Sequence, residues 1–201
     1  MVPAAFSRVF VLVTSISCAL VACAHSAAAP PLIAGERART PKGEVTLVEF
    51  VDFECPFCRT MNDDLAPLVS EYRGRVRVVR KQVPLAPIHL HALDAARASV
   101  CAEAMGKGDE VADALFRTPP EKLTQEGCAA VGEHAGLSPS AFVDCMLNPK
   151  TLESIQADVR SFVSIGGSGV PLLWIDAQRF EGDQGPAAMR DAIETALRDD
   201  Q

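Results

Sequence analysis

The stretch Val-Thr-Leu-Val-Glu-Phe-Val-Asp-Phe-Glu-Cys-Pro-Phe-Cys, at residues 45–58, joins an apolar run directly to two cysteines. Between Val45 and Phe53 the apolar residues occupy both alternating faces, which predicts a central β-strand that is covered on both sides. Glu49 is the exception, because a carboxylate on a buried strand usually has a partner or a function. The sequence therefore predicts a buried strand that ends beside a pair of thiols.

A helix is expected to follow the cysteine pair. Apolar side chains recur at steps of three and four from Phe57 to Tyr72, so this helix should begin at the cysteines. The first thiol then faces the unpaired N–H groups and the positive end of the helix dipole, which both favour a thiolate. We therefore predict that Cys55 is the nucleophile, that Cys58 resolves the mixed disulfide, and that Glu49 accepts or returns the Cys58 proton.

The cysteine pair could instead form a structural disulfide or hold a metal ion. A four-ligand zinc site needs further ligands, and the chain contains no second Cys-x-x-Cys and no His-x3-His. We therefore expect no bound metal or other cofactor. His89 and His91, the nearest imidazoles in the sequence, are interpreted as loop and N-cap residues of a helix that begins at Ala92. A Cu(I) metallochaperone is the alternative from another functional class, although the motif lacks a third soft or histidine ligand nearby.

Composition excludes several classes of protein. The chain has 201 residues, of which 48% are hydrophobic and 22% are charged, and this balance excludes a disordered chain and a polytopic membrane protein. The formal net charge of −7 argues against nucleic-acid binding, because phosphate backbones require a large basic face. We expect a single globular core with an apolar N-terminal attachment, and seven cysteines that need assignment.

The N-terminus has the layout of an export signal. One basic residue, Arg8, precedes an uncharged run over residues 9–24, and small residues and prolines follow. Residues 1–22 are therefore predicted to be a signal peptide, and the Leu-Val-Ala-Cys sequence that ends at Cys23 resembles the lipobox of bacterial lipoproteins. Lipidation of Cys23 would leave residues 23–42 as a tether and would place the domain in the bacterial periplasm, anchored to the membrane. An ordinary cleavage site that releases a soluble protein is the alternative.

Strand and helix patterns follow one another along the remaining chain. Strands are predicted at residues 75–83, 171–175 and 178–180, and a last helix is predicted at residues 186–197. Residues 91–164 show several helical segments and no strand-like alternation. This order predicts an α/β domain that is interrupted by a helical insertion.

Four segments together resemble the DsbA family. They are residues 48–58, the Val-Pro-Leu turn at residues 83–85, the Ala-Phe-Val-Asp-Cys stretch at residues 141–145, and the Gly-Val-Pro-Leu stretch at residues 169–172. The resemblance runs from about residue 45 to residue 197. It implies an exported thiol–disulfide oxidoreductase, with a thioredoxin-like domain at residues 43–90 and 165–201 and a helical insertion at residues 91–164.

The resemblance also implies a function and partners. Proteins of this family exchange disulfides with reduced or unfolded exported proteins, and a quinone-linked membrane protein of the DsbB or VKOR type reoxidises them. We therefore expect a monomeric enzyme that acts as an oxidant. A periplasmic protein-disulfide reductase is the alternative within the same chemistry.

The same resemblance assigns roles around the cysteine pair. Pro171 matches the family's cis-proline and is counted with the catalytic residues. In the family, the loop that holds this proline and the preceding residue, here Val170, lies against the cysteines and binds the substrate strand. Pro56 and Phe57, between the cysteines, complete this substrate-binding surface. Phe57 stands where oxidising members often carry a histidine, and phenylalanine donates no hydrogen bond to the Cys55 thiolate. We therefore expect a less depressed thiol pKa and a milder oxidant.

Three further cysteines lie in the predicted helical insertion. Cys18 leaves with the signal peptide, so Cys101, Cys128 and Cys145 remain, an odd number for an oxidising compartment. One pair and one spare thiol is the simplest arrangement, and three buried free thiols are the alternative. The resemblance favours a structural Cys101–Cys145 disulfide, with Cys128–Cys145 as the second choice.

Overall fold

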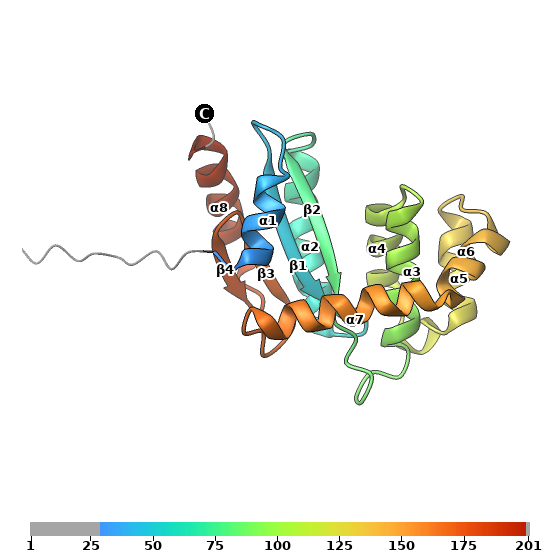
Figure 1. The fold of residues 1–201 in the computed structure, drawn as a ribbon. Coiled ribbons are helices and arrows are strands. Elements are labelled where there is room, and N and C mark those ends of the chain that lie inside the picture. The colour runs from blue at the N-terminus through green and yellow to red at the C-terminus, as the bar shows by residue number, and fades with distance from the viewer. Residues whose placement is uncertain (1–28, 200–201) are drawn as a thin grey trace, which may run out of the picture.

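The fold is built on a four-stranded mixed β-sheet. A computed structural model describes residues 29–199 of the chain, and Figure 1 shows its elements. The strand order is β2-β1-β3-β4, with β1 at Val45–Val51, β2 at Val76–Gln82, β3 at Leu172–Ile175 and β4 at Gln178–Glu181. β1 pairs in parallel with β2, whereas the β1–β3 and β3–β4 pairs are antiparallel. Every residue of β1 is buried, as its apolar pattern predicts.

Helices cover both faces of the sheet. They are α1 (Pro31–Ala38), α2 (Pro56–Glu71), α7 (Pro149–Ser164) and α8 (Gly185–Asp199). α2 and α8 pack on the face that carries Leu47 and Val51, while α1 and α7 pack on the face that carries Val48 and Phe50. Figure 1 shows α1 and α7 in front of the sheet and α2 behind it. These layers confirm the predicted α/β class and place the start of α2 at the end of β1.

A helical unit lies between β2 and β3 in the chain and beside the sheet in space (Figure 1). Besides α7, it contains α3 (Ala92–Ala104), α4 (Gly108–Arg117), a 3-10 turn (Pro120–Lys122), α5 (Gln125–His134) and α6 (Pro139–Leu147). Phe116 and Phe142 are fully buried in its core. A disulfide between Cys101 and Cys145 links α3 to α6, and Cys128 is a buried free thiol. The structure therefore contains one pair and one spare thiol in this unit.

Helix α7 connects the helical unit to the sheet. Near its C-terminal end, the ring of Phe162 packs on Phe50 of β1, with the ring centroids 5.6 Å apart. At the end of β2, Gln82 N donates to Asp158 Oδ2 of α7 at 3.0 Å, and the Gln82 amide donates to Ser99 Oγ of α3 at 3.0 Å. These buried polar contacts hold the point at which the chain leaves the sheet for the helical unit.

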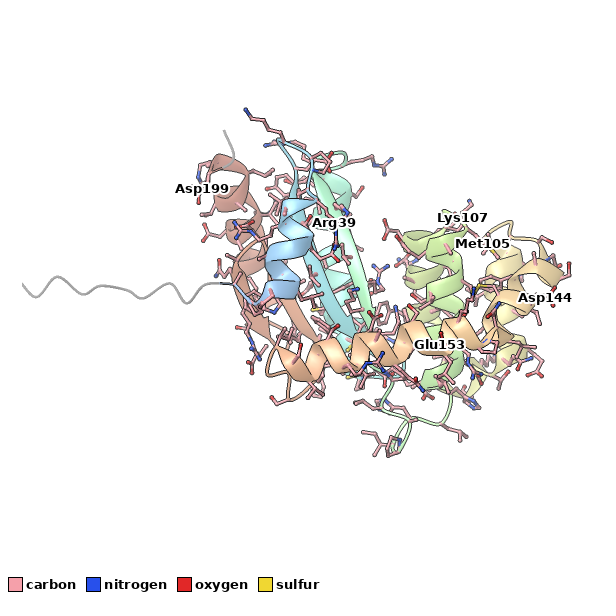
Figure 2. All side chains as sticks on the ribbon, viewed as in Figure 1. Arg39, Met105, Lys107, Asp144, Glu153 and Asp199 are labelled. Carbon is pink, nitrogen blue, oxygen red and sulfur yellow. A yellow bond between two sulfur atoms is a disulfide. The ribbon has the colours of Figure 1, made fainter. Side chains whose placement is uncertain are left out.

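The tether predicted for residues 23–42 is wrong for residues 31–38, which form helix α1 on the sheet. Ile33 is fully buried there, and the buried Glu36 forms an ion pair with Arg39 at 2.8 Å. Figure 2 labels Arg39 beside α1. A helix of two turns is marginal by itself, so burial of Ile33 rather than local sequence propensity stabilises it.

The remaining N-terminal predictions lie outside the described residues. These are the signal peptide at residues 1–22 and the lipidation site at Cys23, since the description begins at residue 29. Within residues 29–199, none of the helices has the length and apolar character needed to cross a membrane.

Candidate active site

The cysteine pair lies at the junction of β1 and α2. Cys55 is the N-cap residue of α2, with an extended backbone, and Pro56 occupies the first helical position. Proline suits this position because its fixed φ fits the helix and the first helical N–H would have no partner within the helix. The backbone N–H groups of Phe57 and Cys58 are directed at Cys55 Sγ. The local sequence therefore builds a site that favours a thiolate.

Both thiols are free in this structure, and their pKa values are shifted in opposite directions. A hydrogen bond from the Cys58 thiol, together with the backbone N–H groups of Cys58 and Phe57, lowers the pKa of Cys55 from 9.0 to about 6, against the opposing effect of burial. Burial and the hydrogen bond that it donates to Cys55 raise the pKa of Cys58 far above 9.0. Cys55 is thus the thiolate nucleophile at neutral pH, and Cys58 is its protonated partner.

The loop before β3 lies against Cys55. The peptide bond between Val170 and Pro171 is cis, and Cys55 Sγ lies 3.8 Å from the Val170 carbonyl oxygen, to which it can donate only as the protonated thiol. The carbonyl oxygen of Pro171 accepts a hydrogen bond from Gly182 N at 2.9 Å, which holds the loop against the segment after β4. The structure thus brings Val170 and Pro171, which are more than a hundred residues away in the sequence, to the nucleophile.

Glu49 lies on β1, fully buried, beside an arginine of the neighbouring strand. Its Oε1 is 2.5 Å from Arg80 Nε, and the two residues are opposite each other in the β1–β2 register. Arg80 is thus the charged partner of the buried Glu49 carboxylate, and no other side chain among residues 29–199 forms an ion pair with it. Among residues 29–199, no hydrogen bond joins Glu49 to Cys58. Its predicted role with the Cys58 proton therefore stays a prediction.

Asp52 is the carboxylate whose charge acts on both thiols, and the sequence interpretation missed it. Its charge raises the pKa of Cys55 and of Cys58, and its backbone N donates to Cys58 Sγ at 3.5 Å. The side chain is fully buried. The signal available in the sequence was an acid three residues before Cys55, at the end of a buried strand.

The loop between β2 and α3 closes over the turn that precedes the cysteines. Leu85 N donates to Asp52 Oδ2 at 2.7 Å, and His89 Nδ1 lies 2.8 Å from the same oxygen. His91 is the N-cap of α3, but its backbone N, not its imidazole, makes a contact, to Glu54 Oε2 at 2.9 Å. His89 is thus a partner of the redox turn rather than only a loop residue.

Three large apolar side chains are exposed around this end of the molecule. Phe57 is 65% exposed between the cysteines, and Ile88 and Leu90 are 74% and 83% exposed on the loop that contacts the redox turn. Exposed apolar side chains beside a reactive thiolate are suited to contact with an unfolded polypeptide. Within residues 29–199, no group of three or more His, Cys, Asp or Glu side chains is arranged to hold a metal ion.

Disulfide exchange is the reaction that a stabilised thiolate beside a second thiol is suited to perform. A family model described as thioredoxin matches residues 39–195, so the chain belongs to the thioredoxin family. The matched region includes the sheet, the cysteine pair and the helical unit.

Solved structures share this fold. A thioredoxin-like oxidoreductase from Silicibacter pomeroyi DSS-3 is 26% identical, with a TM-score of 0.67 over 79% of this chain and 89% of that one. The thiol-disulfide exchange protein alpha-DsbA2 from Wolbachia pipientis shares the fold, at 18% identity and a TM-score of 0.67 over 76% of this chain and 81% of that one. The predicted thioredoxin-like fold is therefore confirmed.

Curated relatives carry this domain as one part of a longer chain. The Na(+)/H(+) antiporter NhaA of Herminiimonas arsenicoxydans is 27% identical over 155 residues, which cover 77% of this chain and 24% of the antiporter. This chain thus spans about a quarter of the length of the curated relatives that it matches.

Proposed function

We propose that the protein oxidises the cysteines of exported proteins by donating a Cys55–Cys58 disulfide. The observation that carries this proposal is the Cys55 pKa of about 6, beside a buried Cys58 thiol whose pKa is raised. A stabilised thiolate favours the reduced form of the pair, so the disulfide form gives up its bond readily. Thiolates in such motifs have pKa values of roughly 3.5 to 7.5, and a value toward the upper part of that range supports a moderate oxidant.

The exchange consists of two substitutions at sulfur. A substrate thiolate attacks Cys55 Sγ of the disulfide to form a mixed disulfide, and Cys58 leaves as a thiolate that takes up one proton. A second substrate thiolate then attacks the substrate sulfur of the mixed disulfide and releases Cys55 as a thiolate. The substrate loses two electrons and two protons. The enzyme gains both electrons and one proton, and the other proton enters the solvent.

Residues around the pair support these steps. Glu49 is the group that we propose to exchange the proton with Cys58, because it is a fully buried carboxylate on the strand that leads to the cysteines. The loop at Val170 and Pro171, together with the exposed Phe57, is the proposed substrate-binding surface.

The bacterial periplasm is the proposed location. The signal-like sequence at residues 1–22 supports export, and the Cys101–Cys145 disulfide supports an oxidising compartment. A lipid on Cys23 would anchor a monomer to the membrane, where a quinone-linked partner of the DsbB or VKOR type would reoxidise it. Incorporation of labelled palmitate that is lost in Cys23→Ser would establish the anchor.

The deciding experiment is the reduction potential of the Cys55–Cys58 pair, measured by equilibration with glutathione buffers. We expect a value between about −120 and −180 mV, the range from DsbA to protein disulfide isomerase. A value near about −270 mV, that of thioredoxin, would overturn the oxidant assignment and favour a reductase. Cys55→Ser should abolish oxidation of a reduced, unfolded protein, and Cys128→Ser, at a buried free thiol of α5 outside the Cys-x-x-Cys motif, should retain it.

A further inference from the structure

A buried carboxylate connects the redox turn to the loop between β2 and α3. Asp52 Oδ1 accepts a hydrogen bond from Glu54 N at 2.8 Å, and Oδ2 accepts one from Leu85 N at 2.7 Å. His89 Nδ1 is 2.8 Å from Oδ2, and the His89 side chain is 19% exposed. None of the exchange steps above uses His89. Its contact with Asp52 therefore needs its own explanation.

The hydrogen bonds fix the direction in which the imidazole donates. Both oxygens of Asp52 accept from backbone N–H groups, as an ionised carboxylate does. His89 Nδ1 must therefore carry the hydrogen that points at Oδ2, and it is the only side-chain donor to this carboxylate among the described residues. The other ionisable groups on this turn and loop are Glu54 and His91, and their contact uses the His91 backbone N.

The charge of Asp52 opposes the chemistry of the site. It raises the pKa of Cys55, whereas the hydrogen bonds to Cys55 Sγ lower it. It also raises the pKa of Cys58, to which the Asp52 backbone N donates. Any group that disperses the negative charge of Asp52 therefore helps to form the Cys55 thiolate.

We propose that His89 is a positioning residue for the redox pair: its Nδ1–H holds the Asp52 carboxylate and limits the repulsion between that carboxylate and the Cys55 thiolate. The role rests on the proposed function, because it concerns the thiolate that disulfide exchange releases. His89 acts through Asp52, so its effect disappears when the charge of Asp52 is removed. The loop between β2 and α3 thus contributes to the acidity of a thiol that it does not carry.

The test is the pKa of Cys55 in the reduced full-length protein, read from the ultraviolet absorbance of the thiolate. His89→Ala should lower the acid dissociation constant of Cys55 by about twofold to threefold, because a carboxylate with one donor fewer repels the thiolate more strongly, while the charge of Asp52 is the smallest influence on this thiol. Asp52→Asn should change the constant in the opposite direction. In the Asp52→Asn background, His89→Ala should have no further effect, which a double-mutant cycle measures directly.

Two variants separate this role from a purely structural one. His89→Asn keeps an N–H donor within reach of Asp52, so it should shift the constant less than His89→Ala does. His91→Ala is the matched control, because its only hydrogen bond to this turn among the described residues uses the backbone N, and it should leave the constant unchanged. Equal shifts in His89→Ala and His91→Ala, equal shifts in His89→Ala and His89→Asn, or a His89→Ala shift that persists in Asp52→Asn would overturn the proposal. The assay needs no substrate, so its outcome is independent of the direction of electron flow.

Discussion

Removal of the Cys58 thiol should raise the pKa of Cys55. The hydrogen bond from Cys58 is the largest cause of the fall in that pKa from 9.0 to about 6. Cys58→Ala deletes this donor, but the backbone N–H groups of Phe57 and of position 58 remain. The pKa of Cys55 in the variant should therefore lie between the two values.

The effect on reactivity follows from two opposing factors. A rise of about 1.5 pKa units, half of the range, cuts the thiolate fraction at pH 6 from about one half to about 3%, or roughly fifteenfold. Each thiolate becomes about fivefold more nucleophilic over the same rise, because the Brønsted slope is about 0.4–0.5. Alkylation of Cys55 at pH 6 should therefore slow by about threefold, whereas at pH 9, where the thiol is ionised in both proteins, it should accelerate by about fivefold.

The assay is the rate of iodoacetamide alkylation of the reduced protein across this pH range. Cys58→Ser is the matched control, because its hydroxyl can still donate, and its midpoint should stay closer to 6. Cys128 adds no background, since it is fully buried and burial raises its pKa to about 12. A rate that changes in the same direction at both pH values, or a midpoint that stays at about 6 in Cys58→Ala, would refute the reasoning.

Three further predictions concern stability. Arg80→Met should destabilise the protein by about 3 kcal/mol in urea unfolding, because Glu49 is left buried without its ion pair; an unchanged midpoint would contradict this. Cys101→Ser should cost about 4 kcal/mol in the same assay, since the disulfide closes a separation of 44 residues, and a loss below about 1 kcal/mol would count against it. The protein with reduced Cys55 should lose stability as the pH falls from about 9 through about 6. The pKa of Cys55 is lower in the folded state than its ordinary value of 9.0, so the thiolate stabilises the fold fully above pH 9 and no longer does so once it is protonated. Unfolding of the oxidised form should lack this dependence.

Much of the fold could be predicted because local patterns of apolar residues indicate its strands and helices. The strand predicted at residues 75–83 is observed at Val76–Gln82, and the helix predicted at residues 186–197 is observed at Gly185–Asp199. Both elements have apolar residues at the spacing of their own period. Helix α1 has no such signal, because its two turns depend on burial of Ile33 by the sheet.

The site shows the same difference between features that follow from local sequence and contacts between residues far apart in the chain. The chemistry of Cys55 and Cys58 follows from their position at the start of a helix, which a short stretch of sequence predicts. The contact between Asp52 and His89 joins residues 37 apart in the chain, and neither has a local pattern that indicates the other. The same holds for the arginine opposite Glu49, which is recognisable only after the register of β1 and β2 is known.

The disulfide between α3 and α6 has a consequence for how the protein matures. Its two cysteines are 44 residues apart in the chain, and they lie in the helical unit rather than at the redox turn. Under the proposed export, the chain reaches the oxidising compartment with these thiols reduced, so an oxidant has to form the bond afterwards. A newly exported molecule is then itself a substrate of the reaction that we propose it catalyses. A mature molecule of the same protein, or another disulfide donor, has to oxidise its two thiols before the disulfide of its helical unit is formed.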